Sequence, residues 1–253
     1  MGDVRWWVRA GGAAPADLAW NIVVFGVAES AWLEVLGVKT KGFDMSKLLH
    51  LEASPRKERS ASIFVARAFI ESYRAAHPAD EVETWDLWAE SLPEFDGETV
   101  NAKYQILHGL EHSSQQASAW QAVTDVFKRF NSADKYLLSV PMWNFGIPYK
   151  LKHFIDVITQ PGLAFSFSPD TGYTGLVTGK PAAVIYTRGG EYSTNEQVRG
   201  LDFQKPYLET LLGFVGFLDI RSVVVEPTLG GPGDVDRVRS VAAEEAKRLA
   251  EWF

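Results

Sequence analysis

The sequence predicts an α/β fold in which a five-stranded parallel sheet is wrapped by helices. From Met45 to the C-terminus, a strand pattern followed by a helix pattern occurs five times. The strand segments "AAVIY" and "SVVVE" contain apolar runs without alternation, which is typical of strands covered on both faces. The hydrophobic content of 46% and the charged content of 23% are those of an ordinary globular protein.

Five short segments carry the strand signal. The first is "KLLHLEA", and the second, "EVETWDLW", alternates between Val82 or Thr84 on one face and Trp85 or Leu87 on the other. The predicted strands cover residues 47–53, 81–88, 135–140, 180–190 and 220–227. A separate hairpin is expected within residues 164–176, with its turn around Asp170–Gly172.

The helices follow from apolar residues at helical spacing. In "SASIFVARAFIESYRAAH", for example, Ile63, Ala66, Phe69, Ile70 and Tyr73 share one face. The predicted helices cover residues 60–77, 116–130, 150–159, 206–217 and 234–253. The polar segment before residue 116 is given no element.

The first 44 residues differ in style from the rest of the chain. They combine paired glycines, alanines and tryptophans without a clean strand or helix period. We expect residues 1–44 to be an N-terminal extension, or an over-long gene prediction, that precedes a domain of residues 45–253. The alternative is a real additional helix, over residues 20–36, docked on the domain.

Composition excludes several classes of function. The net charge of -7 gives a nucleic-acid partner no electrostatic support. The absence of cysteine excludes disulfides, thiolate catalysis and cysteine-ligated metals, and it fits a reducing compartment, so we expect a cytoplasmic protein. No apolar run has the length and purity of a membrane span. The pattern "HGLEH", His108–His112, resembles a zinc motif, but Gly109 weakens its helix and no third ligand is identifiable, so no metal is predicted.

The loop after the first strand, "SPRKERSAS", has the features of a phosphate site. Ser54 ends the strand, and Ser60, Ala61 and Ser62 open the helix. Free backbone N–H groups and the helix dipole attract an anion at such a position, and the loop adds three cationic residues. The alternative is that Ser60 is only an N-cap. The loop has neither a dinucleotide fingerprint nor a Walker pattern, and "GLVTGKP" later in the chain precedes a strand and has the wrong spacing.

Two further loops follow strands at the same predicted edge of the sheet. Met142, Trp143, Asn144 and Phe145 come after the strand at 135–140, where they could flank a planar ligand or simply plug the end of the sheet. Thr187–Gly190, "TRGG", contains paired glycines that either let the backbone approach a ligand or form a flexible turn. Together the three loops indicate a mononucleotide site whose base is broad and aromatic, and a flavin fits it better than adenine.

These residues carry a family resemblance over roughly four-fifths of the chain. "SPR" with "SAS", "PMWNFGIP", "GYTGLVTGK" and "TRGG" occur in order at spacing similar to that of the FMN-dependent NADH:quinone oxidoreductases, also called FMN-dependent NADH azoreductases. The family usually has tyrosine where this chain has Trp143, and serine where it has Thr187. Residues 1–44 lie outside the resemblance.

The resemblance implies a flavodoxin-like, doubly wound sheet, non-covalent FMN, and a homodimer with active sites at its interface. Carried over position by position, Ser54 and Ser60–Ser62 would bind the phosphate. Met142–Phe145 and the residues Thr187, Arg188, Gly189 and Gly190 would surround the flavin ring, and Phe165 matches an aromatic position of the acceptor pocket.

The expected activity is passage of two electrons from NAD(P)H to quinones or azo compounds, in ping-pong order, since no separate dinucleotide site is visible. No side-chain acid or base is obligatory, so no catalytic residue is named. The alternatives are a flavodoxin-type electron carrier and a flavin sensor without turnover of its own. Carriers are typically smaller and more acidic near the flavin, and the cationic loop at residues 54–62 argues mildly against one.

Overall fold

The computed structural model describes residues 45–253, and the expected N-terminal extension, residues 1–44, lies outside them. The sheet consists of five parallel strands in the order β2-β1-β3-β6-β7. These strands are β1 (Lys47–Glu52), β2 (Glu81–Asp86), β3 (Lys135–Pro141), β6 (Ala182–Thr187) and β7 (Ile220–Val225). The parallel five-stranded α/β fold predicted from the sequence is confirmed.

The strand order reverses between β1 and β3. The chain passes from β1 to β2 on one side and then returns to β3 on the other side of β1. Ligands of open parallel sheets bind outside the carboxyl ends of the strands at such a point. The loops after β1, β3 and β6 all begin at this edge, because Glu52 pairs with Ser139 and Pro141 pairs with Thr187.

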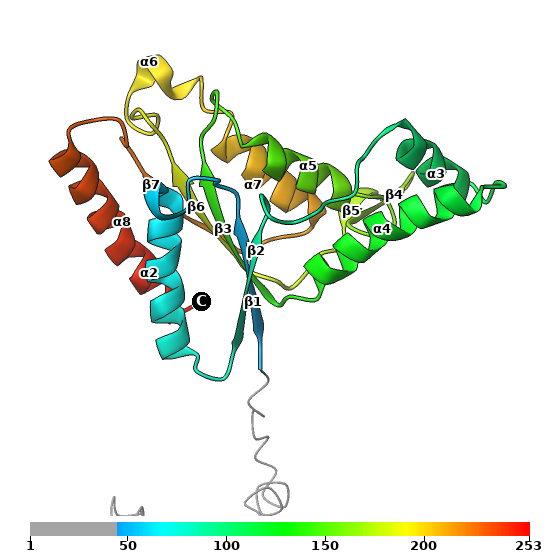
Figure 1. The fold of residues 1–253 in the computed structure, drawn as a ribbon, viewed down its shortest axis with the longest axis horizontal. Coiled ribbons are helices and arrows are strands. Elements are labelled where there is room, and N and C mark those ends of the chain that lie inside the picture. The colour runs from blue at the N-terminus through cyan, green and yellow to red at the C-terminus, as the bar shows by residue number, and fades with distance from the viewer. Residues whose placement is uncertain (1–44) are drawn as a thin grey trace, which may run out of the picture. The chain divides into compact units, whose positions relative to one another are not determined.

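Helices cover both faces of the sheet (Figure 1). The cluster under α2 (Ala61–Ala76) and α8 (Pro232–Glu251) contains Leu48, and the cluster on the opposite face contains its neighbours Leu49 and Leu51. The helices on that second face are α4 (Ser114–Asn131), α5 (Tyr149–Ile158) and α7 (Lys205–Val215). Both faces of β1 are therefore buried, as is typical of a strand inside a parallel sheet.

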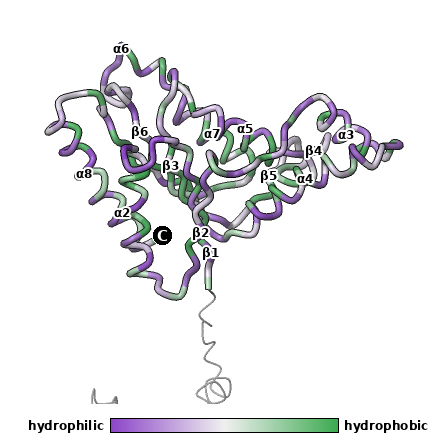
Figure 2. The backbone as a smooth tube through the Cα atoms, in the orientation of Figure 1, coloured by the Kyte–Doolittle hydropathy of each residue, from purple (hydrophilic) through white to green (hydrophobic). Residues whose placement is uncertain are grey.

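Helix α8 shows how weakly apolar a covering helix can be. Figure 2 shows it alternating between hydrophilic and hydrophobic residues along its length. Its buried face is built mainly from alanines, Ala242, Ala243, Ala246 and Ala250, which face α2. Small side chains let two helices approach closely. Helix α8 therefore contributes to the core by packing closely against α2, and not by burying large side chains.

The structure adds elements that the sequence reading left out. The polar segment before residue 116 contains α3 (Gly97–Leu107), which buries only Thr99 and Ala102 and is capped by the side chain of Asp96. A short helix α6 (Glu196–Arg199) and a 3-10 turn at Lys57–Arg59 also form. The predicted hairpin is present as β4 (Phe165–Ser168) and β5 (Gly172–Gly175). Among residues 45–253, no helix has both the length and the apolar character needed to cross a bilayer.

Candidate functional site

The loop after β1 leads into the N-terminus of α2. Ser60 is the N-cap of α2, and its Oγ accepts from the backbone N–H of Ile63 at 3.4 Å and lies 3.1 Å from the Oγ of Ser62. The backbone N–H groups of Ala61 and Ser62 have no intrahelical acceptor in the first turn. Ser54, Ser60 and Ser62 are all buried. Two N–H groups, clustered hydroxyls and the positive end of the helix dipole suit a phosphate group.

The positive charge of this loop is smaller than the sequence suggests. The Lys57 ammonium pairs with the carboxylates of Glu52 and Asp86. Although burial opposes it, the hydrogen bonds to Asp86 and Glu52 raise the pKa of Lys57. Its charge is therefore neutralised by one carboxylate of β1 and one of β2. The exposed Arg56 and Arg59 are the remaining cations of the loop.

The loop after β3, residues 142–146, which we call the aromatic loop, makes a tight turn. Trp143 and Gly146 exchange two backbone hydrogen bonds of 2.9 Å each. The two residues between them, Asn144 and Phe145, have positive φ angles of 46° and 69°, the pattern of a type I′ turn. Asparagine tolerates this conformation, but a bulky side chain rarely adopts it. Such backbone strain clusters at ligand sites, and here it leaves the Phe145 side chain 43% exposed.

The loop after β6, residues 187–190, which we call the glycine loop, lies next to the aromatic loop. The N–H of Met142 donates to the carbonyl oxygen of Thr187 at 2.8 Å. Gly189 has the side chain of Leu229 against it, and its carbonyl oxygen accepts from Leu229 N–H at 3.1 Å. The side chain of Arg188 is buried in ion pairs with Asp202 and Glu226. The backbone of Arg188 is engaged as well: its N–H donates to the carbonyl oxygen of Val225 at 3.0 Å, and its carbonyl oxygen accepts from the N–H of Thr228 at 2.8 Å.

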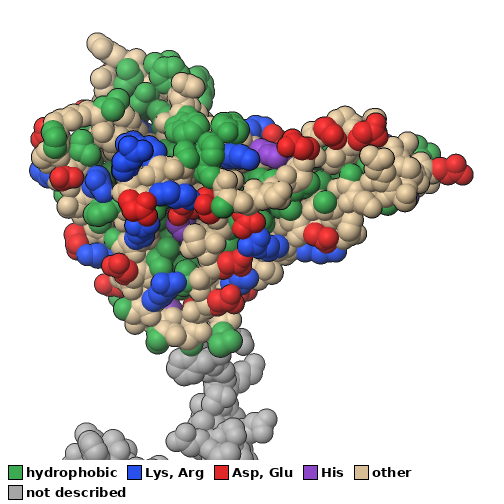
Figure 3. All heavy atoms as spheres, viewed as in Figure 1, with side chains coloured by type: hydrophobic (Ala, Val, Ile, Leu, Met, Phe, Trp, Pro, Cys, Tyr) green, Lys and Arg blue, Asp and Glu red, His purple; other side chains and the backbone are tan. Residues whose placement is uncertain are grey.

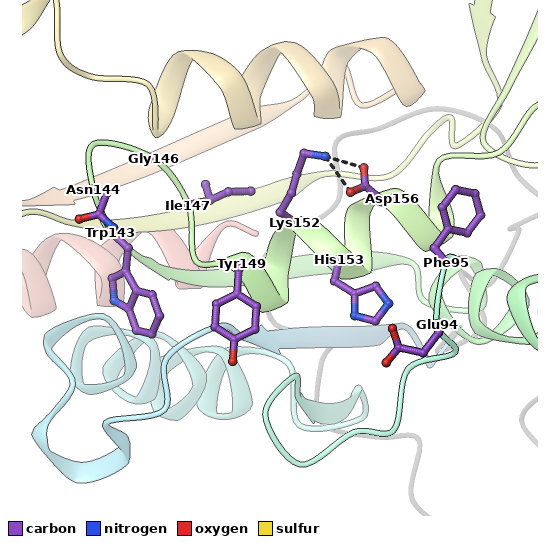
Figure 4. Close-up of a pocket in the computed structure, with 10 residues that line it drawn as sticks. All are labelled: Glu94, Phe95, Trp143, Asn144, Gly146, Ile147, Tyr149, Lys152, His153 and Asp156. Carbon is purple, nitrogen blue, oxygen red and sulfur yellow. Dashed lines mark hydrogen bonds and ion pairs between the residues drawn. The ribbon is translucent and has the colours of Figure 1, made fainter. Parts of the chain in front are cut away.

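An open cavity of about 650 Å³ adjoins the aromatic loop (Figure 4). Its lining comprises Glu94, Phe95, Trp143, Asn144, Gly146, Ile147, Tyr149, Lys152, His153 and Asp156. The Lys152 ammonium and the Asp156 carboxylate form an ion pair at 2.6 Å within it. Figure 3 shows hydrophobic side chains gathered over α6 and the neighbouring loops. A lining that combines aromatic rings with charged groups can accommodate a flat molecule with polar substituents.

Trp88 is a member of this region that sequence reasoning missed. It was assigned to the second strand, but it lies in the turn after β2. Its indole N–H donates to the carbonyl oxygen of Ala53 at 3.0 Å, and its ring lies 5.6 Å from the Trp143 ring and 5.3 Å from the Tyr149 ring. Its position at the end of the strand that pairs with β1 is the sequence feature that could have predicted Trp88 as a site residue.

The structure does not bring Phe165 to the same edge of the sheet. Phe165 begins β4, after α5 has run back toward the amino ends of the strands, and its ring lies 4.9 Å from that of Phe214 near the end of α7. The hairpin is fixed there because Gly175 lies directly against the backbone of Gly216, where a Cβ atom has no room. The other predicted site residues meet at the carboxyl edge.

Comparisons with known proteins match this architecture. A family model described as a flavodoxin-like fold matches residues 46–250. The FMN-dependent NADH:quinone oxidoreductase of Desulfotalea psychrophila is 53% identical over 207 residues, which cover 82% of this chain and 97% of that protein.

Solved structures agree with the sequence relatives. An azoreductase from Bacillus anthracis superposes with a TM-score of 0.76 at 30% identity, covering 83% of this chain and 100% of that one. An FMN-dependent NADH-azoreductase of the same species, solved in complex with FMN, gives 0.73 at 27% identity and covers 81% of this chain and 100% of that one. The resemblance predicted from the sequence is confirmed. The chain belongs to the flavodoxin-like fold family and, within it, to the FMN-dependent NADH:quinone oxidoreductases.

Proposed function

We propose that this chain is an FMN-dependent oxidoreductase that passes two electrons from NADH to quinones and to aromatic azo compounds. One observation carries the proposal: the N-terminus of α2 and the strained aromatic loop lie at one edge of the sheet, at its switch point. The first suits a phosphate and the second a planar ring. The FMN-dependent names of its relatives support this assignment.

We propose that two groups of residues at this edge hold FMN, one at its phosphate and one at its ring. Ser54, Ser60, Ala61 and Ser62 would bind the phosphate, and the residues lining the ring would be Met142, Trp143, Asn144, Phe145, Thr187, Arg188, Gly189 and Gly190. When bound, FMN would supply the hydride-transfer and two-electron chemistry, and these residues would hold it. The protein positions the reactants, and we assign no side chain as an acid or base.

The aromatic loop and the adjoining cavity have a second task, which is to place both substrates in turn. Trp143 lines the cavity together with Tyr149, and these rings offer flat apolar surface to a nicotinamide or a quinone. No dinucleotide fingerprint occurs in the sequence. We therefore propose that NADH leaves before the acceptor enters the same place.

Such an exchange has a kinetic signature. When NADH is varied at several fixed quinone concentrations, the double-reciprocal plots of steady-state rate are expected to be parallel, as ping-pong turnover requires. The control is the same series with the quinone varied at fixed NADH, which must also give parallel lines. Lines that intersect would mean that both substrates are bound together.

A homodimer is part of the proposal, because the resemblance implies both a homodimer and an acceptor contact for Phe165. Within one chain Phe165 lies at the opposite edge from the aromatic loop, so it could reach an acceptor only in a second copy. Phe165→Ala is expected to raise the KM for quinone several-fold and to leave the FMN content unchanged, because only an acceptor contact is lost. Phe167→Ala in the same hairpin is the control. An unchanged KM in Phe165→Ala, or a monomer in sedimentation, contradicts this part of the proposal.

A further inference from the structure

The side chain of Arg188 is the centre of a buried polar cluster behind the glycine loop. It is 1% exposed, and its Nη2 lies 2.7 Å from a carboxylate oxygen of Asp202. Its Nη1 lies 3.3 Å from Glu226. Glu226 is also held by the backbone N–H groups of Tyr192 and Ser193 at 3.0 and 2.9 Å. One guanidinium thus joins the glycine loop, the end of β7 and the segment before α7.

Gln204 extends this cluster toward the aromatic loop. It is 0% exposed, its Oε1 accepts from Arg188 Nε at 3.2 Å, and its Nε2 donates to the carbonyl oxygen of Val140 at 3.0 Å. Val140 is two residues before Met142. Phe203, the residue before Gln204, donates its N–H to the carbonyl oxygen of Phe145 at 3.0 Å. The segment 202–204 therefore holds the end of β3 and the tip of the aromatic loop, and it contacts Arg188 of the glycine loop.

We propose that Arg188 and Gln204 are positioning residues that fix the glycine loop and the aromatic loop relative to each other. This inference rests on the proposed function, since these loops are the two that would surround the flavin ring. The planar guanidinium presents its donors in a fixed fork, and the Gln204 amide relays that orientation as both acceptor and donor. The cluster therefore acts on the cofactor through backbone geometry, although Arg188 itself stands in the "TRGG" motif.

Gln204 offers a cleaner test than Arg188, because removing Arg188 would leave the largely buried carboxylates of Asp202 and Glu226 without their cationic partner and endanger folding. Gln204→Leu removes both links of the relay. Gln204→Glu keeps an acceptor for Arg188 but has no donor for Val140. The matched control is Gln160→Leu: Gln160 is also buried, and its Nε2 donates to the backbone carbonyls of Asp156 and Val157 at 2.6 and 3.2 Å, at the far end of α5.

The experiment titrates FMN into the cofactor-free full chain and measures the Kd from quenching of flavin fluorescence, alongside the Tm without FMN and the visible circular dichroism of the bound flavin. We expect Gln204→Leu and Gln204→Glu to weaken the Kd by about tenfold, the effect of a lost buried hydrogen bond, and to change the dichroism. Gln160→Leu should lower the Tm and leave the Kd within about twofold of wild type.

The outcomes separate this inference from the proposed function. If the wild-type chain binds no FMN, the proposed function fails. If the wild type binds FMN and both Gln204 variants keep its Kd and dichroism, the positioning role is wrong. It is equally wrong if Gln160→Leu weakens the Kd as much as Gln204→Leu does, because the effect would then follow general stability.

Discussion

Ser60→Asp is expected to weaken FMN binding by about 100-fold or more, because like charges a few ångströms apart near a protein surface repel by roughly 4 kcal/mol. The carboxylate would stand at the first turn of α2, where Ser60 now caps the helix and lies 3.1 Å from Ser62. Ser60→Ala removes a hydroxyl bond of about 1 kcal/mol and should weaken binding only about fivefold to tenfold.

In the protein without FMN, the order of the two variants should be reversed: Ser60→Ala should lower the free energy of unfolding more than Ser60→Asp does. Aspartate is a good N-cap and alanine a poor one, so Ser60→Ala is expected to lose about 1 kcal/mol of unfolding free energy and Ser60→Asp much less. FMN titration and urea unfolding measure the two effects. Equal FMN dissociation constants for the variants would count against a phosphate at this helix start.

A loss of stability in mild acid is expected from His50, which β1 places in the interior. His50 is 2% exposed, and its Nε2 lies 3.0 Å from the Oγ of Ser139. Burial, with smaller contributions from the cations Lys57 and Arg67, lowers the pKa of His50 to about 3. The folded chain therefore keeps this ring neutral at a pH where the unfolded chain, with an ordinary histidine pKa near 6.5, already takes up a proton.

The sign follows from the depressed pKa. The contribution of neutral His50 to the free energy of unfolding is fully present above about pH 6.5. As the pH is lowered from there to about pH 3, the free energy of unfolding falls by about 1.4 kcal/mol per pH unit. Between pH 7 and pH 5 His50 thus accounts for a loss of about 2 kcal/mol. His50→Gln, which can still bond to Ser139, should lose that much less than wild type in urea unfolding over this range. Parallel pH profiles of the two proteins would show that His50 is not the group responsible.

The fold could be predicted because each strand has a local pattern: β1, β3 and β6 are buried along most of their length, and the edge strand β2 alternates. The carboxyl edge could be predicted too, since Ser54, Met142 and Thr187 follow three strands that must all point the same way. Helix α3 could not, because it buries only Thr99 and Ala102 and shows little periodicity. A helix that contributes so little to the core leaves little trace in the pattern of apolar residues.

The orientation of charged side chains could not be predicted from the sequence either. Arg188 stands in a loop that suggests ligand contact, but its partners Asp202 and Glu226 come 14 and 38 residues later in the chain. Lys57 likewise pairs with Asp86, on a strand that only the folded sheet brings near. Long-range ion pairs of this kind have no spacing rule, unlike helix caps or strand alternation, so residue type alone could not distinguish ligand contact from internal bracing.

The absorption spectrum of the purified full chain, recorded before and after addition of NADH without oxygen, tests the central claim most directly. We expect flavin bands that correspond to one FMN per chain, bleaching by NADH, and return of the bands on addition of a quinone. An electron carrier or a sensor would bind the flavin without such turnover. A chain that binds no FMN after reconstitution, or whose bound flavin NADH does not reduce, would contradict the account.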